Sequence, residues 1–344
     1  MAGWRYPHSD VPESKLSLAC LPTPLVLLER LSASLGTGQR VWIKRDDLTG
    51  CALSGNKVRK LEFTLADALQ HGADTIITCG GVQSNHCRAT AILGAQLGLK
   101  VHLILRGTPQ EMQSLSGNVL LDLLCGAEIE LHPAHHYNKN FKVLYNDALD
   151  RYRQAGSRPY WITTGASDAV GVWGYVAACE ELRADFEKQR ITNPHIVCAS
   201  GSGGTQAGLV AGNILHELDA TVWGINVCDD EAYFLRKIRD DLKAWKKKYR
   251  LSFAIDEWDI NIIDGYVGEG YAKASDELLA LIADVARLEG LILDPVYSGK
   301  AFYGMLSEIQ RGRFADSKDI VFIHTGGIFG LQPYAGQLAK VLAG

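Results

Sequence analysis

The stretch HIVCASGSGGTQAG, residues 195–208, decides the fold class of this chain. Residues Ile196 to Ala199 are all apolar, as in a strand that is covered on both faces. A glycine-rich loop follows, and then a segment with helical spacing. This strand, loop and helix order is typical of parallel α/β units. The sequence therefore predicts a buried parallel strand that leads into a loop suited to a ligand.

The same alternation of short β-branched runs and longer helical segments continues along the chain. We expect strands at Arg40–Lys44, Thr75–Cys79, Val101–Leu105, Glu128–Leu131, Tyr160–Thr163, His195–Ala199, Thr221–Val227 and Ile320–His324. The strands near 75, 101, 128 and 160 form one group, and those after 195 form another, which is compatible with splits near 50 and 164. The fold class that we predict is α/β, with two doubly wound open parallel-sheet domains.

The composition is that of an ordinary globular protein. Of the 344 residues, 47% are hydrophobic and 22% charged, which suits about two domains and excludes a disordered chain. A net charge of −4 predicts no general attraction to nucleic acid or to an anionic membrane, so an anionic ligand must be held locally. The eight cysteines form no C-x-x-C pair and indicate reduced thiols. Residues 1–16 resemble neither a secretory signal nor a transit peptide, so we expect a cytoplasmic, bacterial protein.

The loop in the opening stretch is a candidate phosphate site. Gly203 and Gly204 allow the backbone to wrap around an anion, and Ser202 and Thr205 add hydroxyl donors. The helix that follows presents the positive end of its dipole to the same place. A dinucleotide loop is an alternative, although Gln206 replaces the third glycine of G-x-G-x-x-G, and a purely structural turn is another.

The segment SGNKVRKLE, residues 54–62, places two lysines in the first turn of a predicted helix. Lys57 shares its stripe with the apolar positions 61, 65 and 68, whereas Lys60 shares its stripe with the polar positions 64, 67 and 71. We therefore expect Lys57 to point inward, where burial favours the neutral amine that attacks a carbonyl carbon. The alternative is a lysine that snorkels along the helix. The nearby glycines have Walker A spacing, but Asn56 and Val58 replace the required lysine and hydroxyl residue.

A second glycine-containing turn, GGVQSNHC at residues 80–87, also leads from a strand into a helix. Its backbone N–H groups suit a carboxylate or a phosphate, and Ser84, Asn85 and His86 supply polar side chains there. Simple capping of the helix is the alternative. A serine hydrolase is disfavoured because the G-x-S-x-G pattern would need glycines at 82 and 86.

Taken together, an inward lysine, a phosphate loop and a carboxylate-binding turn are what a pyridoxal phosphate enzyme needs. Tyr297 follows a predicted buried segment and is a further candidate, a core aromatic being the alternative. We predict no metal site, because the cluster of His132, His135 and His136 has no acidic or thiol partner at ligand spacing. The run Lys246–Lys248 lies among acidic residues and predicts a solvated helix face rather than a nucleic-acid site.

Five runs also resemble one family, the ACC deaminase/D-cysteine desulfhydrase family of fold-type II pyridoxal phosphate enzymes. They are KRDDLTGCALSGNKVRKLEF (44–63), GGVQSNHCRATA (80–91), GSGGTQAG (201–208), EGLILDPVYSGKA (289–301) and FIHTGG (322–327). The resemblance spans nearly the whole chain in order. It implies a large cofactor-binding domain, residues 1–46 plus 165–344, with a small domain, residues 47–164, inserted within it.

The resemblance also implies roles for individual residues. Lys57 matches the Schiff-base lysine. The positions that match cofactor contacts are Asn85, which faces the 3-hydroxyl group, Ser202, Gly203, Gly204 and Thr205, which hold the phosphate, and Ser298 and Thr325. The positions that match substrate contacts or catalytic groups are Ser84, Asn85, His86, Thr325, Tyr297 and Tyr271. Beyond Tyr271 the chain continues Ala-Lys-Ala, where the family often has Gly and Pro.

Two positions separate the branches of this family. At residues 297–300 and 324–327, ring-opening ACC deaminases have motifs similar to Y-E-G-K and H-L-G-G. This chain has Ser298 in YSGK and Thr325 in HTGG, which resembles the desulfhydrase branch with its hydroxyl residues. A carboxylate beside the pyridine nitrogen would keep it protonated and deepen the electron sink, and a neutral serine does so less strongly. Loss of a good leaving group such as a thiolate needs less of this stabilisation.

The resemblance therefore implies α,β-elimination on D-cysteine, giving pyruvate, hydrogen sulfide and ammonia. Lys57 would take the Cα proton, Ser84 would hold the substrate carboxylate, and Tyr297 with Tyr271 would assist proton transfer or the leaving sulfur. The alternatives are an L-cysteate sulfo-lyase or related lyase, an ACC deaminase, and a non-enzymatic pyridoxal phosphate sensor. We expect a small amino-acid substrate, a homodimer as in similar proteins, and Cys87 as the thiol nearest the site.

Overall fold

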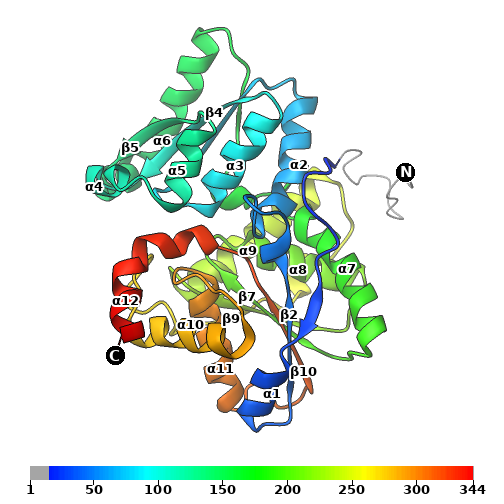
Figure 1. Ribbon diagram of the computed structural model, residues 1–344. Coiled ribbons are helices and arrows are strands. Elements are labelled where there is room, and N and C mark those ends of the chain that lie inside the picture. The colour runs from blue at the N-terminus through cyan, green and yellow to red at the C-terminus, as the bar shows by residue number, and fades with distance from the viewer. Residues whose placement is uncertain (1–14, 344) are drawn as a thin grey trace.

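The computed structural model describes residues 15–343, which form two α/β lobes (Figure 1). The smaller lobe, at the top of Figure 1, contains β3 to β6, and the larger lobe contains the remaining strands. Most of the N-terminal segment that argued against a signal or transit peptide lies outside the described residues. Between residues 15 and 343, no helix has the length and the apolar character that crossing a membrane requires.

The sheet of the larger lobe has six strands in the order β1-β2-β10-β7-β8-β9. They are β1 (Leu25–Leu27), β2 (Arg40–Lys44), β10 (Asp319–Ile323), β7 (His195–Ser200), β8 (Thr221–Asn226) and β9 (Asn261–Ile263). β1 runs antiparallel to β2, and the other neighbours are parallel. Since β2 pairs with β10, the two ends of the chain build this sheet together.

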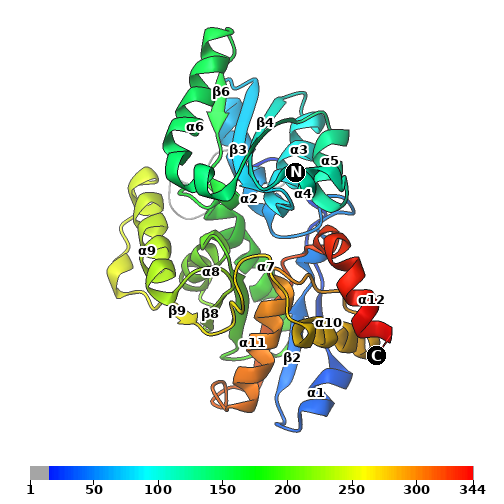
Figure 2. The same cartoon turned by 90° about the vertical axis from the view of Figure 1, so that its left-hand side faces the viewer.

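Helices cover both faces of the six-stranded sheet, because successive side chains of its strands point to opposite sides and both sides are apolar. One face packs against α7 (Trp173–Gln189), α8 (Gly204–Leu215) and α9 (Glu231–Lys248). The other packs against α1 (Glu29–Leu35), α10 (Asp276–Glu289) and α11 (Ser298–Gln310), with α12 (Ala335–Ala343) beside α10. Figure 2 shows α9 and α10 on opposite flanks of the lobe.

The smaller lobe is built on four parallel strands in the order β5-β4-β3-β6. They are β5 (Glu128–His132), β4 (Lys100–Arg106), β3 (Thr75–Gly81) and β6 (Pro159–Trp161). One face packs against α2 (Lys57–Gln70), α3 (Asn85–Gln96) and α5 (Gly117–Leu124), and the other against α6 (Ala134–Gln154). The short helix α4 (Pro109–Gln113) follows β4.

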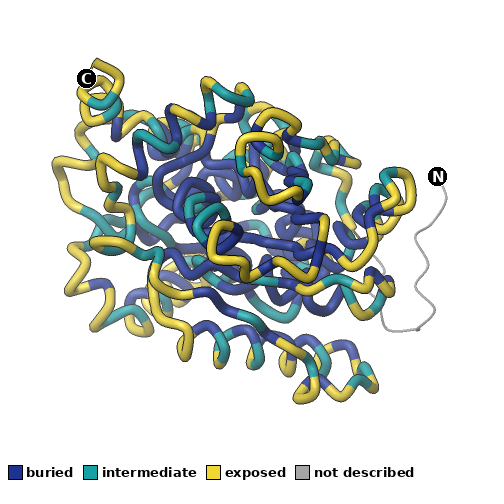
Figure 3. Tube along the Cα trace, turned by 90° about the horizontal axis from the view of Figure 1, so that it is seen from below, coloured by how far each residue is buried: buried dark blue, intermediate teal, exposed yellow. Residues whose placement is uncertain are grey.

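The two sheets confirm the predicted fold class and the two predicted groups of strands. The strands β1 and β9, of three residues each, were not predicted. The limits of the inserted domain, residues 47–164, stay a prediction. Figure 3 shows that the buried parts of the chain run through the middle of the molecule, while the exposed parts lie on its periphery.

Helix α2 corrects one expectation, because Lys60, assigned to the polar face, is fully buried. One side of α2 packs through Val58 and Leu61 into the core of the smaller lobe. Its other side packs against α7 of the larger lobe, and a Cβ atom on Gly174 of α7 would lie only 2.7 Å from the backbone of Arg59. The stripe argument assumed one solvent face, but this helix lies between two lobes and has none at that position.

Candidate active site

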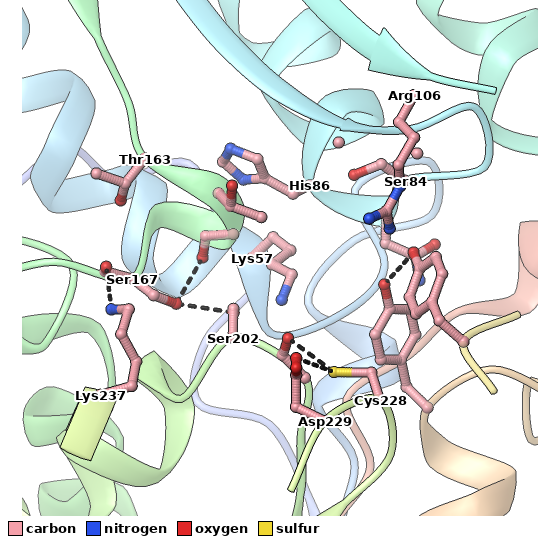
Figure 4. A pocket seen from close by; sticks show the side chains of 18 of the residues that line it. Lys57, Ser84, His86, Arg106, Thr163, Ser167, Ser202, Cys228, Asp229 and Lys237 are labelled. Atoms are coloured by element: carbon pink, nitrogen blue, oxygen red, sulfur yellow. Dashed lines mark hydrogen bonds between the residues drawn. The ribbon is translucent and has the colours of Figure 1, made fainter. Parts of the chain in front are cut away.

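A cavity of about 570 Å³ lies where the carboxyl ends of both sheets meet. Its walls come from the segments that follow β3, β6, β7 and β8, and from the last residue of β4 (Figure 4). Open parallel sheets bind ligands at these ends. A smaller cavity adjoins it, because both are lined by Lys57, Asn85, Gly201, Ser202 and Tyr297. The two cavities bring together most of the residues singled out from the sequence.

Lys57 begins α2 and lines both cavities, as the sequence predicted for an inward lysine. Burial lowers its pKa to about 8; the carboxylate of Asp294 raises this pKa, and the charge of Arg88 lowers it further. With a pKa of about 8, roughly a tenth of the amine is neutral at pH 7, several hundred times the fraction in an ordinary lysine. In the described part of the chain no hydrogen bond or ion pair engages its Nζ. Lys57 is thus available as a nucleophile.

The glycine-rich loop after β7 forms a cradle at the start of α8. Gly203 has φ +81°, a left-handed conformation that favours glycine. A Cβ atom on Gly204 would lie 2.5 Å from Ser167 Oγ, so the close approach of the loop to Ser167 also requires glycine. Asn56 Nδ2 donates to Thr205 Oγ1 at 2.8 Å, which leaves the threonine hydroxyl hydrogen for a ligand. Backbone N–H groups and hydroxyls converge there, as an anion requires.

Two residues that the sequence reasoning missed support this cradle. Ser167 Oγ accepts from the Gly204 amide at 3.2 Å and shares a hydrogen bond with Ser202 Oγ at 2.8 Å. Behind it, Lys60 Nζ donates to Ser167 Oγ at 3.3 Å. Burial, together with the charge of Lys57, lowers the pKa of Lys60 well below its ordinary value. The buried amine has no carboxylate within ion-pair distance among the described residues, so a phosphate in the cradle would supply the missing negative charge.

The turn after β3 contributes Ser84, Asn85 and His86 to the cavity. Ser84 is the N-cap of α3, and its Oγ accepts from the Cys87 amide at 3.2 Å; it caps the helix and also lines the cavity. Arg88 donates to Asn85 Oδ1 at 2.9 Å, which fixes the amide and leaves its Nδ2 to donate. These groups surround the positive end of α3, where a carboxylate is stabilised.

His86 is fully buried, and desolvation lowers its pKa well below the ordinary value, so it is neutral. Its Nε2 is 2.8 Å from Thr78 Oγ1, and its buried Nδ1 has no hydrogen-bond partner among the described residues. His86 lines the larger cavity. The neutral ring is therefore suited to polar contact with a ligand and not to carrying charge.

Tyr271 and Tyr297 form a pair in the same cavity, although their segments are far apart in the sequence. Their hydroxyl oxygens are 2.7 Å apart, and burial raises the pKa of both. Lys300 donates to the carbonyls of Val267 and Gly270, both at 2.7 Å, and so holds the loop that carries Tyr271. Each hydroxyl remains protonated at neutral pH and can donate a proton.

Ser298 lies behind the cavity wall and lines neither cavity, whereas Thr325 lines the smaller one. Ser298 Oγ donates to Asp294 Oδ1 at 2.7 Å. Asp294, which the sequence reasoning did not single out, also accepts from the amides of Val296, Tyr297 and Ser298 at 2.8–2.9 Å. This buried carboxylate therefore fixes the backbone that presents Tyr297.

The cysteine that lines the cavity is not the one that we expected from the sequence. Cys87 is buried behind Ser84 and does not line either cavity, while Cys228 lines the larger one. Cys228 Sγ donates to Gly201 O at 3.4 Å, and burial raises its pKa to about 12. The thiol is protonated and unreactive at neutral pH. The prediction failed because Cys228, which is distant from Ser84 in the sequence, reaches the cavity from the segment that follows β8 in the larger lobe.

These residues fit pyridoxal phosphate. Two features line adjoining cavities: Lys57, an amine with a lowered pKa, and the anion cradle, which the buried Lys60 supports from behind. The cradle and the amine come from different elements, α8 and α2, and the turn before α3 supplies polar groups for a second anion. A phosphate group, a carbonyl carbon and an amino-acid carboxylate each have a complementary group here.

Comparisons with known proteins agree with this assignment. Residues 16–326 match the family model described as pyridoxal-phosphate dependent enzyme. The chain is 40% identical over 98% of its length to the bifunctional D-cysteine desulfhydrase/1-aminocyclopropane-1-carboxylate deaminase, mitochondrial, of Arabidopsis thaliana, covering 84% of that protein. It is also 40% identical to the D-cysteine desulfhydrase of Serratia proteamaculans, over 94% of this chain and 97% of that one.

Solved structures give the same result. An ACC deaminase homologue superposes with a TM-score of 0.85 at 36% identity, covering 95% of this chain and 96% of the other. O-ureido-L-serine synthase, at 17% identity and a TM-score of 0.65, shares the fold. The chain therefore belongs to the ACC deaminase/D-cysteine desulfhydrase family of pyridoxal-phosphate-dependent fold-type II enzymes.

Proposed function

We propose that this enzyme catalyses α,β-elimination on D-cysteine, releasing pyruvate, hydrogen sulfide and ammonia. The observation that carries the proposal is Ser298, a neutral residue. It stands at the position that matches the glutamate of the Y-E-G-K motif in ring-opening ACC deaminases. Its hydroxyl donates to Asp294 Oδ1 and accepts from the Asp294 amide, so Ser298 adds no negative charge of its own behind the cavity wall. Two relatives at 40% identity carry the name D-cysteine desulfhydrase, one of them as a bifunctional enzyme. The D preference rests on the resemblance alone.

The residues of the cavity divide the work of this reaction. Bound pyridoxal phosphate withdraws electrons from the substrate Cα. Lys57 takes the Cα proton, which its lowered pKa permits near neutral pH. Ser84 and the amides at the start of α3 hold the substrate carboxylate and orient the Cα–H bond toward Lys57. The hydroxyl pair of Tyr297 and Tyr271 supplies a proton to the departing sulfur.

The test is a panel of amino acids, the chiral ones as both enantiomers, with pyruvate, sulfide and sulfite measured separately. It contains cysteine, cysteate, serine and 1-aminocyclopropane-1-carboxylate, which gives 2-oxobutanoate in place of pyruvate. The highest kcat/KM with D-cysteine supports the proposal. Sulfite release from L-cysteate as the fastest reaction would assign the sulfo-lyase instead. A visible cofactor band without turnover of any substrate would indicate a sensor.

ACC deaminase is the second candidate, because two further relatives carry the name putative 1-aminocyclopropane-1-carboxylate deaminase. They come from Thermotoga maritima, at 40% identity, and Pyrococcus abyssi, at 38% identity. The reaction opens a cyclopropane ring and needs a deeper electron sink than loss of a thiolate. In Ser298→Glu the added carboxylate should raise this activity relative to D-cysteine elimination, and an unchanged ratio would remove the role assigned to Ser298.

We also propose a cytoplasmic homodimer, as the resemblance implies. Support comes from three apolar side chains, Leu48, Ile292 and Ile328, which are 41–48% exposed and line one further cavity. Isolated exposed leucines are common, but a group of them around one hollow suits a partner surface. Light scattering coupled to size-exclusion chromatography tests the dimer, and the monomer mass would refute it.

A further inference from the structure

Arg106 is the one residue of β4 that lines the larger cavity. It ends the strand at the carboxyl edge of the smaller sheet, where its partner in β3, Gly81, also lines the cavity. Figure 4 shows its side chain on the far side of Lys57 from Ser167 and Lys237. The arginine thus lies opposite the phosphate cradle. None of the steps proposed above involves it.

The guanidinium is held in place without using its hydrogen-bond donors. Its central carbon lies 5.2 Å from the ring centre of Tyr271 and 5.9 Å from that of Tyr137. Within residues 15–343 no hydrogen bond or ion pair engages its nitrogen atoms. Of the two lysines that line the same cavity, Lys237 is paired with Asp241, and Lys57 is the amine already assigned to the cofactor. Arg106 therefore faces the cavity with its whole fork of donors free.

A half-buried arginine with free donors is suited to an anion. The planar guanidinium has five N–H groups, which match the two oxygens of a carboxylate, sulfonate or phosphate. The phosphate of the cofactor has its own site at Ser202 to Thr205, and the substrate carboxylate has the start of α3. A third anionic group in the cavity is then a group on the substrate side chain.

Resting on the proposed elimination, we propose that Arg106 binds the β-substituent of the substrate and stabilises negative charge on it, whether that charge is present beforehand or develops on the departing sulfur. In the reaction the Cα–H electrons form the Cα=Cβ bond, and the Cβ–S bond breaks with both electrons passing to sulfur. D-Cysteine then loses HS⁻, and a β-sulfonate loses sulfite. The free N–H donors of Arg106 receive this charge, and Tyr271, which lies against the guanidinium, supplies a proton to the sulfur.

The proposal predicts how binding changes in Arg106→Gln. Cysteate has a permanently charged β-substituent, and serine has a neutral one of smaller size. Loss of a charge-assisted hydrogen bond, about 1.5–3 kcal/mol, corresponds to a dissociation constant about 10- to 150-fold higher. We expect that loss for cysteate and less than about threefold for serine. Arg106→Lys, which keeps the charge and loses the fork, should fall between wild type and Arg106→Gln.

The experiment measures both dissociation constants from the change in the visible absorption of the holoenzyme, with each enantiomer of each ligand, and does not require turnover. Lys237→Gln is the matched control, because it removes one positive charge from the same cavity but from a lysine that is already paired. An equal loss for cysteate and serine in Arg106→Gln, or a spectrum that neither ligand changes in the wild type, would overturn the proposal. If cysteate binding depends on Arg106 while no substrate is turned over, this inference stands and the proposed function fails.

Discussion

Replacement of Lys60 by methionine should stabilise the apoprotein and weaken cofactor binding at the same time. Lys60 is fully buried, and its Nζ makes a single hydrogen bond of 3.3 Å, to Ser167 Oγ. Methionine has nearly the same length and shape but no amine. The substitution therefore keeps the packing of α2 between the two lobes and removes only the buried polar group.

The two effects have opposite signs because the amine lacks an anion until the phosphate binds. A buried polar group without adequate partners costs about 1–3 kcal/mol, so the apoprotein should gain stability of that order in Lys60→Met. With phosphate in the cradle, the lysine contributes a charge-assisted interaction through Ser167 and Ser202, or directly, of about 1.5–3 kcal/mol. Its loss corresponds to a dissociation constant for pyridoxal phosphate about 10- to 150-fold higher.

The stability gain should also depend on pH. The pKa of Lys60 is lower in the folded protein than the ordinary value of 10.5 in the unfolded chain. Between these two pKa values the unfolded state binds more protons, so wild-type stability rises with pH in that range. Methionine removes this dependence. The advantage of Lys60→Met should therefore be largest at the acidic end of the range and decrease as the pH approaches 10.5.

Urea unfolding of the apoprotein at several pH values measures the first effect, and titration of the visible band with pyridoxal phosphate measures the second. Lys100→Met serves as the control, since Lys100 is exposed at the start of β4 and should change neither quantity. A less stable apoprotein with unchanged cofactor affinity would show that Lys60 is a structural lysine and that its assignment to the phosphate cradle is wrong.

Four further predictions follow from the cavity. Lys57→Ala should abolish the visible cofactor band while the protein stays folded by circular dichroism; a retained band would exclude this lysine. Tyr297→Phe should keep the band and lower kcat about 100-fold by loss of proton transfer, and unchanged pyruvate release would contradict that role. Gly204→Ala should weaken pyridoxal phosphate binding roughly tenfold, because its Cβ would meet Ser167 Oγ at 2.5 Å, unlike an alanine at Gly336, where the space is open. Cys228, with its pKa raised to about 12, should resist iodoacetamide at pH 7.5, and early labelling in a peptide map would refute this.

The sequence predicted the features that have a local signal. The apolar strands could be located from their composition, and Lys57 from its place on an apolar stripe, because each signal lies within about ten residues. Lys60 and Arg106 carry no such signal. Lys60 is buried because a second lobe covers the outer side of α2, and Arg106 reaches the cavity because β4 ends level with β3 in the sheet. Both depend on contacts between segments that are distant in the chain.

The positions of the cations explain how a protein with a net charge of −4 accommodates a cofactor and a substrate that are both anionic. The overall charge supplies no attraction, so the selection of anions must occur inside the cavity. In the arrangement that we propose, the phosphate would meet backbone amides backed by Lys60, the substrate carboxylate would meet the positive end of α3, and the substrate side chain would meet Arg106. A buried amine such as Lys60 is stabilised in its charged form only when an anion is present beside it. The guanidinium of Arg106, which lies over the ring of Tyr271, is charged without an anion. In that arrangement the resident cofactor would lie against Lys60, whose charge it stabilises, and the transient substrate would lie against Arg106, which is charged before the substrate arrives.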